Sequence, residues 1–62
     1  MQEQMTLEEY KKKVEECLKK AVGADNQDYI TSRMKLYEED FPTFLEKNLS
    51  PEVTATALIM GA

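Results

Sequence analysis

The sequence contains no histidine and a single cysteine, Cys17. One cysteine cannot form a disulfide within the chain, so the class of small secreted proteins held together by disulfides is excluded. Without histidine, one cysteine cannot complete a tetrahedral zinc site, which leaves only oxygen ligands for a metal ion. Nucleophilic catalysis lacks its usual base, because no imidazole is present to activate a thiol or a hydroxyl group. We therefore expect a protein without a cofactor and without enzymatic activity.

Glycine and long apolar stretches are also scarce among the 62 residues. The chain has two glycines, Gly23 and Gly61, each at the end of a helix-like segment, so it has no glycine-rich phosphate loop. The longest apolar run, residues 57–60, is too short to cross a membrane. Residues 1–4 have neither the basic nor the apolar region of a signal peptide. These features predict a soluble, cytoplasmic protein that does not insert into a membrane.

Two acidic segments are candidates for metal binding or acid–base chemistry. The segment that begins at Asp25 resembles the start of a calcium-binding loop, but its sixth residue would be Ile30 instead of glycine and its twelfth Leu36 instead of glutamate. Glu38-Glu39-Asp40 offers neighbouring carboxylates, but consecutive residues of a helix point in different directions. A chain this small also offers no deep cleft in which a carboxyl group could be desolvated. We expect neither a metal site nor a catalytic residue here.

Two segments carry clear helix signals at both ends. Thr6 and Glu9 form a capping box before residues 7–22, in which apolar residues recur every three or four positions, and Gly23 follows as a stop signal. Cys17 lies in this apolar stripe, which favours a buried, unreactive thiol. Ser50 is a helix cap with a proline after it in the first helical position, so residues 51–60 form the last helix.

The middle of the chain predicts helices over residues 27–40 and 42–48. Asp25 or Asn26 is expected to cap the first of them, and Asp40 the second. Pro42 separates them because it cannot donate a hydrogen bond to the carbonyl of Glu38, and the choice between a kink and a break stays open. Residues 1–62 are thus predicted to form one small all-α domain, a bundle of three to four short helices (about 7–22, 27–40, 42–48 and 51–60), with residues 1–5 as a loose N-terminal end.

Charged residues are divided unevenly along the chain. Residues 1–24 contain five lysines and five glutamates, whereas residues 25–62 contain three basic and seven acidic residues, so the net charge of −4 belongs to the second part. Lysines that are interleaved with glutamates do not form a nucleic-acid surface, which makes nucleic acid an unlikely partner. A DNA-binding or transcription-associated helical module is kept as an alternative, because Gly23 stands between two helices. The expected ion pairs of the first helix are Glu8–Lys12, Glu9–Lys13, Glu15–Lys19 and Glu16–Lys20, while Lys11 is expected to lie along the apolar stripe.

The acidic second part also contains aromatic residues, a combination that suits contact with a basic protein surface. Tyr37, Phe41 and Phe44 follow the apolar stripe, which favours a buried core over a partner contact, and both interpretations stay open. In the last helix, Val53, Ala57 and Met60 share one face, and either Leu58 or Ile59 is expected to face a partner, which could be a second copy of the chain. The predicted partner-binding residues are Tyr37, Glu38, Glu39, Asp40, Phe41, Leu58, Ile59 and Met60.

The leading hypothesis is therefore a non-enzymatic helical protein that acts by protein–protein interaction, as a homo-oligomer or with a larger partner. An acidic mimic of nucleic acid is a further alternative. The segment Tyr37-Glu38-Glu39-Asp40-Phe41-Pro42-Thr43-Phe44-Leu45, followed by Leu49-Ser50-Pro51-Glu52, resembles short helical proteins encoded by bacterial phages and other mobile elements. The resemblance assigns no role to any residue, and it implies an accessory protein or an inhibitor of a host factor.

Overall fold

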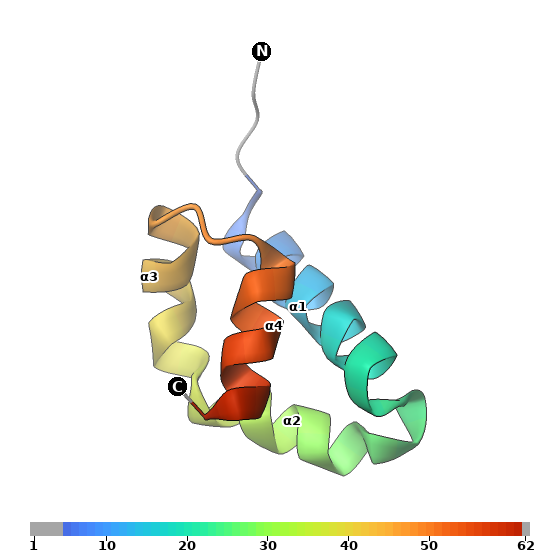
Figure 1. Ribbon diagram of the computed structural model, residues 1–62. Coiled ribbons are helices and arrows are strands. Elements are labelled where there is room, and N and C mark those ends of the chain that lie inside the picture. The colour runs from blue at the N-terminus through green and yellow to red at the C-terminus, as the bar shows by residue number, and fades with distance from the viewer. Residues whose placement is uncertain (1–4, 62) are drawn as a thin grey trace.

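The computed structural model describes residues 5–61, and it is all-α, as the sequence predicts. Over this range the chain forms α1 (Leu7–Val22), α2 (Gln27–Leu36), α3 (Phe41–Glu46) and α4 (Pro51–Met60), with short 3-10 helices η1 (Ala24–Asn26) and η2 (Glu38–Asp40). In Figure 1, α4 lies between α3 and α1, and α2 runs across the end at which α1 finishes. The most extensive packing is between α1 and α4.

The ends of α1 follow from local hydrogen bonds. The Thr6 hydroxyl accepts a hydrogen bond from the Glu9 backbone N–H at 3.1 Å, and the Glu9 carboxylate accepts one from the Thr6 N–H at 3.1 Å, which confirms the capping box. At the other end, the Gly23 N–H donates to the carbonyl of Lys19. The Asn26 side chain donates to the carbonyl of Val22, so it closes the end of α1 and does not cap α2 as predicted.

The predicted helix over residues 27–40 is too long. α2 ends at Leu36, η2 follows, and α3 begins at Phe41, so the interruption lies before Pro42 and not at it. Pro42 then occupies the first turn of α3, where a backbone N–H would have no partner inside the helix. The side chain of Asp40 makes no capping hydrogen bond, and α3 ends at Glu46 instead of residue 48.

The turn between α3 and α4 contains the non-glycine residue with positive φ, Asn48 at 62°. The Leu49 N–H donates to the carbonyl of Phe44 at 3.1 Å, and the Asn48 N–H donates to the carbonyl of Leu45 at 3.0 Å. These two bonds are the Schellman pattern, in which the residue after the helix adopts the left-handed conformation that asparagine tolerates well. Ser50 then caps α4, since its hydroxyl accepts a hydrogen bond from the Val53 N–H at 3.2 Å.

The core lies where α1, α2, α3 and α4 meet, and it is built around two aromatic rings. The rings of Tyr10 and Phe41 pack edge to face, with their centroids 6.3 Å apart, and Phe44 packs against Phe41 in the same way at 6.0 Å. The Tyr10 hydroxyl donates to the carbonyl of Leu49 at 2.9 Å and is hydrogen-bonded to the hydroxyl of Thr54. The buried apolar residues are Tyr10, Val14, Leu18, Ile30, Phe41, Ala55 and Leu58.

Candidate protein-binding surface

One side of α4 faces away from the core and is almost entirely apolar. The buried side of this helix consists of Thr54, Ala55 and Leu58. Successive residues of a helix are about 100° apart around its axis. The residues that lie opposite this buried side cover an arc of about 100°. Residues 53–61 contain no charged side chain. We call this arc the outer strip of α4, and it consists of Val53, Thr56, Ala57 and Met60.

The outer strip exposes two large apolar side chains. The exposed fraction of Met60 is 76%, and that of Val53 is 55%. Since a helix with apolar residues on all sides is normally covered on all sides, α4 has an uncovered face in the isolated chain. Leu36, at the end of α2, is a third large apolar residue with high exposure, at 65%.

A groove between α1 and α4 adjoins the outer strip. It consists of two hollows of about 270 and 290 Å³, both of which are lined by Cys17, Lys20 and Glu52. Thr56 and Ile59 line the larger hollow from α4, so Thr56 belongs to the groove and to the strip. Cys17, which the sequence places in the apolar stripe of α1, is partly buried against the core and lines this groove, so its thiol is not fully covered. We call this feature the α1–α4 groove.

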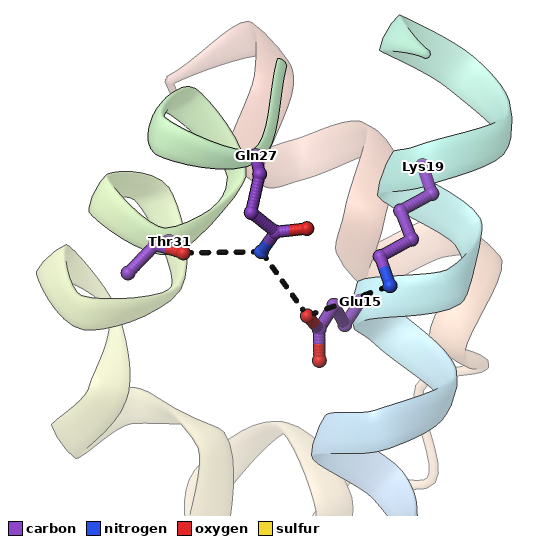
Figure 2. A network of polar contacts seen from close by, with 4 residues as sticks. All are labelled: Glu15, Lys19, Gln27 and Thr31. Atoms are coloured by element: carbon purple, nitrogen blue, oxygen red, sulfur yellow. Dashed lines mark hydrogen bonds and ion pairs between the residues drawn. The ribbon is translucent and has the colours of Figure 1, made fainter. Parts of the chain in front are cut away.

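A further hollow, of about 370 Å³, lies between α1 and the α2–η2 segment. Figure 2 shows that the Gln27 side-chain amide donates to the Glu15 carboxylate of α1 at 3.3 Å and, within α2, to the Thr31 hydroxyl at 3.1 Å. The ammonium of Lys19 lies 3.9 Å from the same carboxylate. The ammonium of Lys11 lies 6.0 Å from the centroid of the buried Phe41 ring, in agreement with the expectation that its stem follows the apolar stripe.

Of the four ion pairs expected on α1, all within the described part of the chain, the structure forms Glu15–Lys19. Glu9 takes part in the capping box instead of pairing with Lys13. An exposed pair of this kind contributes about 0.2–0.5 kcal/mol, so the missing pairs change the stability of α1 little. Their charges remain on the surface, where lysines and glutamates alternate.

The structure separates the predicted partner-binding residues into three groups. Phe41 and Leu58 are buried in the core, so in this conformation their side chains are not available to a partner. Tyr37 and Ile59 are half-buried against the core. Exposed residues of the set are Glu38, Glu39 and Asp40 in η2, and Met60 at the end of α4.

Two exposed apolar residues were not among the predicted ones. Val53 follows the spacing that puts it on the face of Met60, but spacing alone does not say which face of a helix is outward. At about 100° per residue, Leu36 lies on the side of α2 away from Ile30 and Met34, so its exposure follows from its position on the helix and could have been predicted from the spacing. The sequence carries no signal for the exposure of Val53, because its neighbour Thr54, a polar residue, is on the buried side of α4.

Residues 5–61 contain neither a metal-binding cluster nor a membrane-spanning helix. No group of three or more histidine, cysteine, aspartate or glutamate side chains in this range is arranged to hold a metal ion. None of the helices in the same range is long and apolar enough to cross a membrane. Comparison of the chain with known protein families, with curated proteins and with solved structures finds no match.

Proposed function

We propose that this chain is a non-enzymatic helical protein that acts by binding protein, either itself or a larger partner, through the outer strip of α4. The observation that carries the proposal is the exposure of Met60 and Val53 on a helix face without charge. Complete burial of an apolar side chain of this size contributes about 1.5–3 kcal/mol. A few such residues, surrounded by contacts that exclude water, supply most of the binding energy in many interfaces.

Negative charge in η2, which follows the C-terminal end of α2, supports a partner with a basic surface. Glu38, Glu39 and Asp40 are consecutive and exposed in η2, and the net charge of the chain is −4. Such a surface accelerates the encounter with a basic partner while it contributes little to the lifetime of the complex. The resemblance to phage and mobile-element proteins favours an accessory protein or an inhibitor of a host factor. The proposal places the protein in the cytoplasm, where a free thiol such as Cys17 stays reduced.

The experiment compares three immobilised forms of the chain as baits in a lysate of the native host. Wild type is expected to retain a protein that Met60→Glu loses, because the new carboxylate would have to be buried without a partner. Leu36→Glu is the matched control, since Leu36 is an equally apolar residue of high exposure on another helix. Circular dichroism should show the same helix content for all three forms. Capture of the same proteins by wild type and by Met60→Glu would contradict a role of the strip.

An acidic mimic of nucleic acid is a second candidate, favoured by the three exposed acids of η2. Neutralisation by Glu38→Gln, Glu39→Gln and Asp40→Asn is then expected to slow association with a nucleic-acid-binding protein at low salt and to leave the melting temperature unchanged. Stopped-flow mixing measures the rate. A rate that does not depend on these three charges removes this candidate.

The third candidate, a DNA-binding module, is less well supported than the other two, because α2 presents few cations to a DNA backbone. Arg33, one of the two cations of this helix, lies 5.4 Å from the centroid of the Tyr29 ring and donates to the Tyr29 hydroxyl at 3.4 Å. It is directed along its own helix, and η2 adds three acids beside it. A gel-shift assay at low salt is the test, in which a retarded DNA band would restore this alternative.

A further inference from the structure

The outer strip of α4 and the α1–α4 groove lie next to each other, the first with an exposed side chain and the second with a hollow. Met60 projects from the strip, and methionine is a flexible side chain that fills irregular apolar gaps. The larger hollow of the groove has an apolar lining from Cys17, Ala21 and Ile59. Because Thr56 belongs to both features, the projection and the hollow adjoin each other on one side of the molecule.

We infer that a second copy of this chain covers the outer strip, with Met60 of each copy seated in the α1–α4 groove of the other. This inference rests on the proposed function and names the partner. In a dimer with two-fold symmetry every contact occurs twice. The second copy would therefore place its own Met60 in the groove of the first copy and would surround Met60 of the first copy with its own groove. A different protein would have to supply a hollow and a projection of its own.

Charge also favours a second copy as the occupant. The chain carries a net charge of −4, so two copies repel each other wherever the exposed acids face one another. Residues 53–61 carry no charge, so the part of the contact in which one outer strip meets the other takes no ion out of water, and charged side chains enter only at the groove. Lys20 and Glu52 at the groove have opposite signs and add no net charge to the contact. A basic partner would instead be drawn toward η2.

The size of the surface sets the expected strength of the dimer. α4 has ten residues. At about 1.5 Å per residue it is about 15 Å long, and a footprint about 20 Å wide that includes the groove covers about 300 Å² on each copy. The total of about 600 Å² is well below the roughly 1,200 Å² of stable complexes. A contact of this size is typical of weak, transient complexes, so we expect a reversible dimer with a dissociation constant on the order of 0.1–1 mM.

Sedimentation equilibrium from about 20 μM to about 2 mM tests the inference. The mass of wild type is expected to rise from 7.1 kDa toward twice that value. Met60→Glu removes the projection, and Ala21→Arg fills the hollow from an exposed position, so both variants should keep the helix content and stay monomeric. Leu36→Glu, the control, should associate as wild type does. Association that survives the first two variants, or is lost in the control, overturns the inference.

Cys17 provides a second readout, because its half-buried thiol lies in the groove that Met60 would cover. For a dissociation constant of about 0.3 mM, about a quarter of the chains are monomeric at about 2 mM, so alkylation should be about fourfold slower there than at about 20 μM. The control is Cys17→Ser combined with Ser32→Cys, which moves the thiol to an exposed position on α2 and should remove the concentration dependence. A Cys17 alkylation rate that is independent of concentration overturns the inference.

The two proposals fail in different ways. If the chain stays monomeric throughout while capture of another protein is lost with Met60→Glu, the strip binds a different partner, so the dimer fails and the proposed function stands. If neither the mass nor the captured proteins respond to Met60→Glu, both fail.

Discussion

The hydroxyl group of Tyr10 is the polar centre of the core, and the substitution Tyr10→Phe tests how the helices are held together. Tyr10 is completely buried, and its O–H donates to the carbonyl of Leu49 at 2.9 Å. Because tyrosine has one hydroxyl proton, the hydrogen bond between Tyr10 and Thr54 must have the threonine hydroxyl as donor. One oxygen atom thus connects α1 to the loop before α4 and to the first turns of α4.

The cost of Tyr10→Phe follows from the two groups that lose their partner. A buried polar group left without a hydrogen bond costs about 1–3 kcal/mol. Thr54 is 1% exposed, whereas the Leu49 carbonyl belongs to a half-buried residue that regains some hydration. We therefore expect the free energy of unfolding to fall by about 2–3 kcal/mol, out of a total of about 3–9 kcal/mol for a domain of this length. The melting temperature should fall by about 10–20 °C.

Urea unfolding followed by circular dichroism measures the effect, and Thr54→Val completes a double-mutant cycle. Thr54→Val should cost about 0.5–1 kcal/mol, and the double variant should cost about 0.5–1 kcal/mol less than the sum, because the shared hydrogen bond is lost only once. Tyr29→Phe is the control, since the Tyr29 hydroxyl only accepts a long hydrogen bond of 3.4 Å from Arg33, and should cost under about 0.5 kcal/mol. Additive effects, or equal effects of Tyr10→Phe and Tyr29→Phe, would refute the reasoning.

Five further substitutions at four positions, measured by the same urea unfolding, test the helix ends and the orientation of α4. Gly23→Ala should lower the free energy of unfolding by about 1–3 kcal/mol, because φ is 94° and ψ is 142° at this position. The added Cβ atom would meet only ordinary contacts, so the loss comes from the backbone, and an unchanged free energy would contradict this backbone conformation. Asn48→Gly should raise the free energy of unfolding by up to about 1 kcal/mol, and Asn48→Val should lower it by about 1–2 kcal/mol, because residue 48 has a positive φ. The reverse order of stability would exclude a left-handed residue at this turn. Leu58→Ala should cost about 2–5 kcal/mol and Met60→Ala under about 0.5 kcal/mol, whereas equal costs would mean that α4 is turned differently.

The limits of α1 and α4 could be predicted from the sequence because their signals are local. Thr6 and Glu9 satisfy each other's backbone N–H groups within one turn, and Ser50 does the same for Val53, without help from the rest of the chain. Gly61 ends α4 in the left-handed conformation for an equally local reason. Such short-range interactions can be recognised in any sequence that contains them.

The middle of the chain could not be predicted in the same way. The apolar spacing through Ile30, Met34, Tyr37 and Phe41 fits one long helix, yet α2 ends at Leu36. Phe41 reaches the core as the first residue of a new helix, where its ring packs against that of Tyr10. Spacing along one helix cannot distinguish this arrangement from a continuous rod, because the position of the partner ring depends on how α1 and α3 pack.

The candidate site shows the same division. By itself, the sequence determined that α4 exists, where it begins and ends, that its C-terminal part has no charge, and that Val53, Ala57 and Met60 share a face. Only the tertiary structure decided that this face is outward. The physical reason is the long-range packing of α4, which buries Ala55 and Leu58 together with Thr54, a residue that would normally face water. The Thr54 hydroxyl is satisfied there by the Tyr10 hydroxyl, 44 positions away in the chain, and this orientation of α4 leaves Met60 exposed.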